Sequence, residues 1–406
     1  MLQQPAFGRR LRQLRAARGM SQTALAGDGM STGYLSRLET GARRPTSRAV
    51  TYLAGRLGVP PDDLAAPAAG SLADVLTLAA SLPERSTDAA VDAVRGALAA
   101  DPDADPVLRW QALWLLARVR RREGDHAGER VRLDELVALS EEIGLAELRV
   151  RGLTGLARCL RSLGEIAPAL DAAVTAHDLA RADGLGVQDR AGALLALVSV
   201  EAEAGRLPEA RAHADELTGL VAGRSDTLWA EALWTAAAVR VRQGEHAAAQ
   251  ALLDRALEGF PGGEDLVLWL RLRFAAARLN LQRTPPRTDD AGRCVAAAEP
   301  ALAFVGTAAL RQELALLKAE LAFHTGRRDE ARARLAELAG DEPRMTYRDR
   351  VRLDVLRHRL RFLSGDDTAL HTLRALALRA QADASLDLAT ELWGVVADLL
   401  LTARDG

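Results

Sequence analysis

The chain has 406 residues and a formal net charge of −2, which allows two or three domains and a large buried core. Only 4% of the residues are aromatic, while alanine, leucine and arginine dominate. These three residues are the least costly to place in a helix, so a mostly helical protein is expected. The two cysteines, Cys159 and Cys294, are too few for a disulfide framework and lack zinc-site spacing. The N-terminal residues contain no apolar run of signal-peptide length, and the longest apolar stretch, residues 191–200, is half as long as a membrane span requires.

Charge is distributed unevenly along the chain. Residues 1–61 contain ten arginines and two acidic residues, a net charge of +8, which leaves −10 for the remainder. A basic N-terminal segment attached to an acidic body indicates a nucleic-acid-binding module whose body does not itself follow the DNA. This electrostatic attraction is independent of base sequence, so it predicts the partner but not the site.

Residues 21–41 predict two short helices joined by a tight turn that contains glycine. Ser21 is the expected N-cap of the first helix, and Ser31 is the N-cap of the second, which ends at Gly41. Leu35 and Leu38 give the second helix a buried face. Its other face carries the small, polar or cationic residues Thr32, Gly33, Ser36 and Arg37. A helix with such a face can enter a DNA major groove and reach the base edges.

Residues 7–59 resemble the Cro/repressor-type (XRE family) helix-turn-helix domain. The matching features are FGRRLRQLRAARGMSQ at 7–22, YLSRLE at 34–39, GARRP at 41–45 and a helix at 47–57 closed by glycine. The turn before Ser31 is one residue shorter than the commonest pattern of that family. The resemblance covers about a seventh of the chain, and it implies a sequence-specific DNA-binding protein.

The resemblance also implies roles for individual residues. Gln22 matches a residue that anchors a DNA phosphate at a helix N-terminus. Arg37 matches a base-reading position, where a guanidinium can bridge O6 and N7 of guanine. Arg15 and Glu39 match an internal ion pair and are expected to be structural. The alternative for any single arginine is a solvated surface charge. The expected DNA-binding set is Gln22, Ser31, Thr32, Gly33, Ser36, Arg37, Arg43 and Arg44.

Three regions are expected along the chain. Residues 1–66 form the helix-turn-helix domain, with five helices, of which the last begins near Pro60. Residues 67–106 are a linker and connecting helices, with two helical patterns in 72–100. Residues 107–406 form a separate repeat domain that acts as sensor and dimerisation domain.

A repeat of about 40 residues begins after residue 107. Turn-forming glycines stand at 124, 164, 205, 244, 326 and 365, with spacings of 40, 41, 39, 82 and 39. Four of them are followed five residues later by an alanine, a small residue that lets paired helices approach closely. The pattern predicts seven helical hairpins and a final capping helix over 386–402. The fifth hairpin lacks its glycine and has prolines at the turn, so an altered connection is expected there.

The repeat resembles tetratricopeptide (TPR) repeats, as in GRLPEAR at 205–211, although its period is about 40 residues instead of 34. The predicted fold is therefore all-α: an N-terminal five-helix helix-turn-helix domain followed by a TPR-like α-solenoid of helical hairpins. This combination resembles the bacterial peptide-sensing, or quorum-sensing, regulators of the RRNPP kind.

The first helices of the hairpins carry the candidate effector residues. Arginines precede two successive turn glycines by six and three residues, and two tryptophans stand ten residues before a turn glycine. In TPR-like folds such offsets point to the concave side, where they suit a peptide with a carboxylate end and an apolar side chain. The alternative is surface ion pairing for the arginines and core packing for the tryptophans. The candidates are Trp114, Arg118, Arg121, Arg158, Arg161, Trp234 and Asn280, the last being the only asparagine.

No catalytic constellation or glycine-rich phosphate loop is present, so we expect no enzyme, no cofactor and no metal. The leading hypothesis is a bacterial transcription regulator that binds a palindromic operator in double-stranded DNA as a homodimer. Its TPR-like domain would bind a peptide or other effector that modulates DNA binding. The protein is expected in the cytoplasm, away from membranes, and at the nucleoid when bound to DNA. The alternative is an interaction scaffold whose repeats bind a protein partner, with no small effector.

Overall fold

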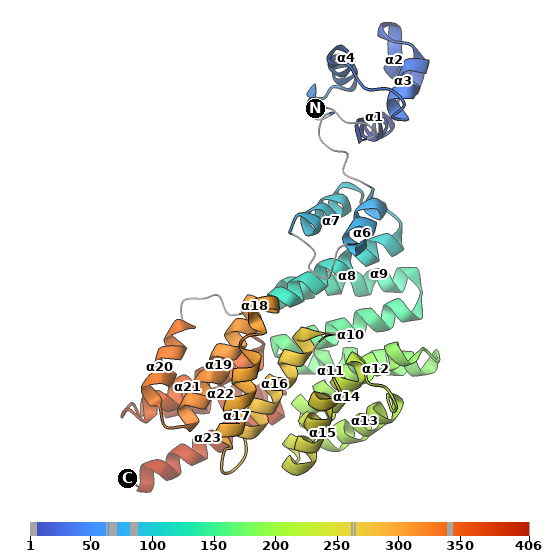
Figure 1. Ribbon diagram of the computed structural model, residues 1–406. Coiled ribbons are helices and arrows are strands. Elements are labelled where there is room, and N and C mark those ends of the chain that lie inside the picture. Colours follow the sequence, from blue (N-terminus) through green and yellow to red (C-terminus); the bar gives the residue numbers. More distant parts are fainter. Residues whose placement is uncertain are drawn as a thin grey trace. The chain divides into compact units, whose positions relative to one another are not determined.

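The structure is a computed structural model, and it describes residues 6–61, 64, 71–81, 88–260, 263, 265–338 and 344–405 (Figure 1). Within these ranges every regular element is a helix, which confirms the all-α prediction. The chain divides into two compact units, residues 1–112 and 113–406, with the boundary inside helix α8 (Pro106–Glu123). No helix in the described ranges combines the length and the apolarity needed to cross a bilayer.

The first unit begins with the helices of the head, which we define as residues 6–61. They are α1 (Ala6–Ala17), α2 (Gln22–Ala26), the 3₁₀ turn η1 (Gly27–Gly29), α3 (Thr32–Glu39) and α4 (Ser47–Leu57). The hydroxyls of Ser21 and Ser31 each accept a hydrogen bond from the backbone N–H three residues later, which confirms both predicted N-caps. The predicted fifth helix falls mostly on residues 62–63 and 65–66, which lie outside the described residues.

One apolar face of each helix builds the core of the head. Leu11 from α1, Leu25 from α2, Leu35 and Leu38 from α3, and Leu53 from α4 are fully buried together. Each such side chain contributes about 1.5–3 kcal/mol through burial, which is how a domain of this size holds together. The face of α3 that remains outside this core is therefore free to contact another molecule.

The rest of the first unit contains the helix pair α6 (Leu72–Ser81) and α7 (Asp88–Ala100), the two helices expected in residues 72–100. The pair buries Leu72, Val75 and Leu76 from α6, and Val91 and Val94 from α7. Residues 101–105 interrupt the helical structure before α8, as their acids and proline predict.

The second unit is a series of helix pairs that can be followed from α9 to α23 in Figure 1. Its described residues form seven pairs and a final helix, as the repeat predicts. The pairs are α8 with α9 (His126–Ile143), α10 (Ala146–Leu163) with α11 (Ile166–Ala182), α12 (Val187–Glu203) with α13 (Leu207–Leu220), α14 (Thr227–Arg242) with α15 (His246–Gly259), α16 (Leu266–Leu281) with α17 (Thr288–Ala298), α19 (Ala308–His324) with α20 (Arg328–Glu337) and α21 (Tyr347–Phe362) with α22 (Thr368–Ala382). The final helix is α23 (Leu386–Asp405), and a short α18 (Leu302–Val305) was not predicted.

The turn glycines adopt the backbone conformation that their spacing predicts. All six have a positive φ, from 74° at Gly124 to 92° at Gly365, a region that other residues enter only with strain. The alanines five residues later, at 169, 210, 249 and 331, are fully buried where the paired helices meet. In the fifth pair, which has no such glycine, the Arg287 N–H donates to the Asn280 carbonyl across the turn at 2.9 Å.

The C-terminal part of the second unit packs against the turns of its first hairpins. A Cβ added to Gly124 would lie 2.4 Å from the Arg344 carbonyl, and one added to Gly164 would lie 2.6 Å from the ring of Tyr347. At Gly205 the corresponding neighbour is the Cβ of Leu386, at 3.0 Å. The turns of the first three hairpins thus lie against the start of α21 and of α23, and these contacts enclose the inner side of the unit.

Candidate functional site

The exposed face of α3 matches the surface predicted to read DNA. Thr32, Gly33 and Arg37 are exposed and Ser36 is half-buried. A methyl group added at Gly33 would meet no atom within 4 Å, so this part of the helix is open to a large partner. Ser31 is exposed too, but its hydroxyl is used to cap the helix through the Tyr34 N–H. A smooth face with one long cationic side chain suits a major groove.

The buried carboxylate of Glu39 joins helices α1, α2 and α3. Glu39 accepts hydrogen bonds from Arg15 at 2.6 and 3.0 Å and from the amide nitrogen of Gln22 at 2.8 Å. The predicted Arg15–Glu39 ion pair is thereby confirmed. Burial acts to raise the pKa of Glu39, but the hydrogen bonds from Arg15 and Gln22 outweigh it and lower that pKa. The Gln22 amide keeps a second N–H for another acceptor.

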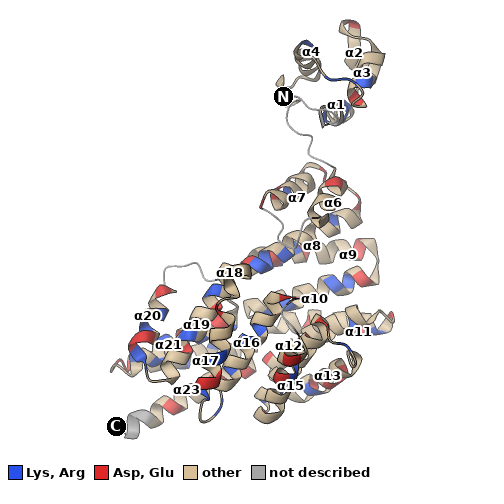
Figure 2. Cartoon of the chain, viewed as in Figure 1, with Lys and Arg blue, Asp and Glu red and all other residues tan. Residues whose placement is uncertain are grey.

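Two further arginines follow α3 and are exposed. The guanidinium of Arg43 lies over the ring of Tyr34, 5.2 Å from its centre, and its backbone N–H donates to the Arg37 carbonyl. Arg44 is exposed beside it. In Figure 2 the chain next to α3 is coloured blue, the colour of lysine and arginine. The head thus presents cations both on α3 and on the loop that follows it, an arrangement that would attract the phosphates of a nucleic acid.

A cavity of about 750 Å³ lies on the inner side of the second unit, a size typical of small-ligand and peptide sites. Most of its lining comes from the first helix of each pair, namely α8, α10, α12, α14, α16, α19 and α21, together with α23. Ten arginines and six carboxylates line it, between aliphatic side chains and Trp234. The cavity is therefore amphipathic, with an excess of positive charge.

One group of charges in the cavity is centred on Glu203. This carboxylate accepts from Arg348 at 2.6 and 3.0 Å and from Arg242 at 3.3 Å. Arg242 and Arg348 also pair with Asp387, and Arg161 lies 3.7 Å from Glu203. Burial acts to raise the pKa of Glu203, yet the surrounding guanidiniums lower it to about 2. This network joins α10, α12, α14, α21 and α23 across the cavity.

A second group of charges is also internally paired. Arg278 lies 3.0 Å from Glu313 and 3.0 Å from Asp349, and Arg352 pairs with Asp349 and Glu391. These residues join α16, α19, α21 and α23. Each of these guanidiniums already has a carboxylate as counter-charge, so this side of the cavity contributes less to the excess of positive charge.

The structure brings four of the seven predicted effector residues to this cavity: Arg121, Arg158, Arg161 and Trp234. Arg242, Arg271 and Arg348 also line the cavity and were not predicted. Arg271 lies in the hairpin without a turn glycine, so no offset could be measured for it. Arg348 belongs to α21, and only the closure of the unit places it beside α12.

The other three predicted residues lie elsewhere. Arg118 is exposed outside the cavity, and the ring of Trp114 packs with Leu133 and Cys159. Asn280 is buried, and its amide donates to the Ala276 carbonyl of its own helix at 2.9 Å. We therefore leave these three out of the effector site proposed below.

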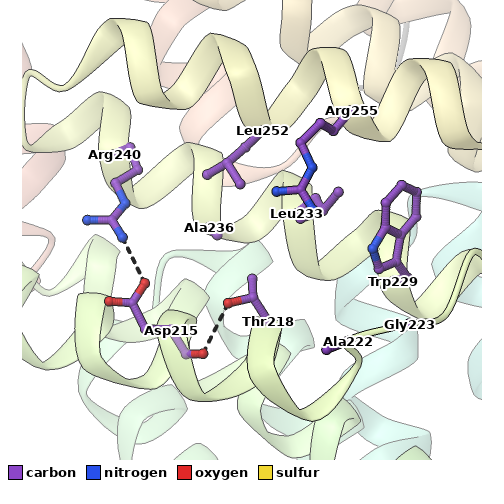
Figure 3. Close-up of a pocket in the computed structure, with 10 residues that line it drawn as sticks. All are labelled: Asp215, Thr218, Ala222, Gly223, Trp229, Leu233, Ala236, Arg240, Leu252 and Arg255. Atoms are coloured by element: carbon purple, nitrogen blue, oxygen red, sulfur yellow. Dashed lines mark hydrogen bonds and ion pairs between the residues drawn. The ribbon is translucent and has the colours of Figure 1, made fainter.

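A smaller cleft of about 210 Å³ lies between α13, α14 and α15. Figure 3 shows Asp215 paired with Arg240, at 2.7 Å, and the side chain of Arg255 extended towards Leu233. The Thr218 hydroxyl donates to the Asp215 backbone carbonyl at 3.0 Å. The only carboxylate of the cleft is thus held by an arginine, and the arrangement offers no nucleophile with an adjacent base. In the described part of the chain, no three His, Cys, Asp or Glu side chains are grouped so as to hold a metal.

Comparison with known proteins identifies the N-terminal domain and the repeat fold. Residues 6–66 match the family described as "Helix-turn-helix domain". Among curated proteins, none matches this sequence. The helix-turn-helix part of the resemblance noted in the sequence is thereby confirmed.

Two solved structures share the fold over nearly the whole chain. The Rap protein complexed with Competence and Sporulation Factor is 10% identical, with a TM-score of 0.56 and 98% of each chain covered. The Rap conjugation gene regulator of plasmid pLS20, in complex with the Phr* peptide, is 12% identical, with a TM-score of 0.55 and 97% of each chain covered. At these identities the likeness shows the fold alone.

Proposed function

We propose, from the helix-turn-helix domain at residues 6–66, that this chain is a transcription regulator that binds specific DNA sequences as a homodimer. Its helical-repeat unit binds a peptide or other effector in the 750 Å³ cavity, and the effector changes DNA binding. The observation that carries the proposal is the exposed face of α3, held by a buried ion pair on a domain of net positive charge. The Rap conjugation gene regulator, which has a similar fold, was solved in complex with a peptide, and this supports a peptide as effector.

Arg37 is proposed to make the main base contact, so Arg37→Ala is expected to reduce affinity for a specific duplex about tenfold to a hundredfold. Its affinity for random duplex should change much less, since one of ten arginines in residues 1–61 is lost. Titration of both duplexes at physiological salt measures the ratio of the affinity for the specific duplex to the affinity for the random duplex. Arg18→Ala is the control. Arg18 lies just after α1 and not on α3, and its guanidinium donates to the Leu14 carbonyl, so its loss should weaken both duplexes alike. An unchanged ratio in Arg37→Ala would remove Arg37 as the reader.

The last helix supplies a surface for the second copy. Leu386, Trp393 and Leu400 are 47%, 36% and 51% exposed and recur every seven residues, so they form one stripe along α23. The end of a helical repeat array normally carries a polar outer face, whereas α23 carries this apolar stripe beside exposed polar residues such as Glu391 and Asp398. In a symmetric antiparallel pair of α23 helices, Trp393 would lie near the two-fold axis.

Trp393→Asp is therefore expected to convert a dimer into a monomer, because a carboxylate would be buried near the axis without a partner. Sedimentation velocity at micromolar concentration measures the change. Val131→Asp is the matched control, since Val131 is 52% exposed in the middle of α9 and lies outside the stripe. A wild-type protein that sediments as a monomer, or a Trp393→Asp variant that remains dimeric, contradicts this role of α23.

A further inference from the structure

Three arginines that line the cavity have no carboxylate of their own. Arg121 comes from α8, Arg158 from α10 and Arg271 from α16. In the part of the chain that the structure describes, none of them forms an ion pair, whereas Arg242, Arg278, Arg348 and Arg352 all do. The only hydrogen bond that the Arg158 guanidinium makes there is a long one, 3.4 Å, to the Gly192 carbonyl.

The guanidinium of Arg121 lies close enough to Arg158 and to Arg271 to repel both. Burial lowers the pKa of Arg158 to about 10, and the charge of Arg121 contributes to the decrease. Burial and the charge of Arg121 also lower the pKa of Arg271. Arg158 and Arg271 are half-buried, and Arg121 is exposed at the edge of the cavity. A desolvated cation without a counter-charge is costly, so the two half-buried arginines destabilise the protein when the cavity is empty.

A neighbouring arginine has an unsatisfied donor in the same cavity. The Nε of Arg161 is buried and has no hydrogen-bond partner among the described residues. The Nη1 atom of Arg161 lies 3.7 Å from the Glu203 carboxylate, which already accepts hydrogen bonds from Arg348 and Arg242. Buried donors of this kind are rare in proteins unless a ligand or a water satisfies them.

The internal alternatives are Glu313 on α19, which acts on Arg271 but already pairs with Arg278, and Glu231 on α14. The charge of Glu231 acts on both Arg158 and Arg271, but it makes an ion pair with neither in the described residues. One carboxylate cannot neutralise three guanidiniums, so an excess of positive charge remains. Apolar surface lies beside it: Trp234 follows Glu231 by one helical turn, Val267 precedes Arg271 by one turn, and both line the cavity.

We propose that Arg121, Arg158 and Arg271 form a subsite for the carboxylate or phosphate group of an amphipathic ligand, with Trp234 and Val267 against its apolar part. Guanidinium groups bind both anions through paired N–H donors. This subsite rests on the proposed function, because it specifies the charged group of the effector that the cavity is proposed to bind. The ligand supplies the counter-charge that the protein lacks, which couples its binding to the stability of the second unit.

Thermal unfolding of the full chain with three eight-carbon probes tests the subsite. Octanoate and octyl phosphate carry the two candidate anions, and octan-1-ol has the same chain without charge. We expect either anion, at matched ionic strength, to raise the unfolding temperature of the second unit more than octan-1-ol does. The anion with the larger effect identifies the head group. If neither anion stabilises the protein more than octan-1-ol, the proposal is overturned.

Arg158→Gln and Arg271→Gln are expected to weaken binding of the preferred anion about tenfold or more. Without ligand, both variants should unfold at a temperature at least as high as that of the wild type, because an unpaired, half-buried charge has been removed. Arg374→Gln, at an exposed position of α22, is the control and should retain the full stabilisation by the anion. Anion stabilisation that persists in both cavity variants, or variants clearly less stable than the wild type without ligand, would refute the subsite.

The same preparations separate this inference from the proposed function. If Arg37-dependent DNA binding is found but the anion effect is independent of Arg158 and Arg271, only the subsite fails. If the anion effect requires both arginines but no duplex is preferred, the subsite stands and the DNA-binding proposal fails.

Discussion

Gly8→Ala is expected to unfold the N-terminal head and abolish its DNA binding. A Cβ at this position would lie 2.3 Å from the Leu38 carbonyl oxygen and 2.7 Å from that of Glu39. Both atoms belong to the backbone of α3, which cannot move aside because Leu38 is buried in the core and Glu39 is held by Arg15. Overpacking of this kind costs about 3 kcal/mol, which is comparable with the total stability of a domain of this size.

Hydrogen exchange followed by mass spectrometry measures this effect in the full chain, through the protection of α1 and α3. Gly55→Ala is the matched control, because a Cβ there meets nothing within 4 Å and Gly55 lies inside α4. That substitution should stabilise the head by about 0.5–1 kcal/mol. Wild-type protection of α1 and α3 in Gly8→Ala would show that these helices do not meet as described.

Glu203→Gln is expected to destabilise the second unit by about 3 kcal/mol at neutral pH. Glu203 is 4% exposed and accepts hydrogen bonds from Arg348 and Arg242. Its loss would leave three guanidiniums, those of Arg161, Arg242 and Arg348, with less counter-charge inside the protein. Denaturation in urea, followed by tryptophan fluorescence, measures the difference in free energy of unfolding.

The effect should depend on pH in a defined direction. The pKa of Glu203 is lowered from its ordinary value near 4.5 to about 2, so its stabilisation is complete above pH 4.5 and is lost as the pH falls towards 2. The difference between wild type and Glu203→Gln should therefore shrink over this interval. Glu135→Gln is the control, because its pair with Arg132 is exposed and contributes less than about 1 kcal/mol. A Glu203→Gln variant as stable as the wild type at pH 7 would contradict the network.

Local signals account for what could be predicted of the fold. A glycine at a positive φ and a serine at an N-cap depend on a few neighbouring residues, so Gly164, Gly205, Ser21 and Ser31 could be interpreted directly from the sequence. The period of the glycines then predicts the number of helix pairs. The short α18 has only four residues and no place in the period of the glycines, so it could not be predicted in this way.

The cavity could be predicted only in part, because it depends on contacts between distant residues. Arg158 and Arg161 share offsets from a turn glycine and do line it. Arg118 has the same offset as Arg158 but lies outside the cavity. The ring of Trp114 packs against α10 at Gly155, where the absence of a side chain leaves room for it. The pairs Arg242–Asp387 and Arg348–Glu203 join residues 145 apart, a separation over which no repeat offset applies.

The central claim is that the head recognises particular DNA sequences as part of a two-fold dimer. Selection of bound duplexes from a random pool by the wild-type protein, at physiological ionic strength, tests it most directly. We predict enrichment of a palindromic sequence whose half-sites are about one helical turn apart. A retained pool with the same base composition and order as the starting pool would contradict the claim.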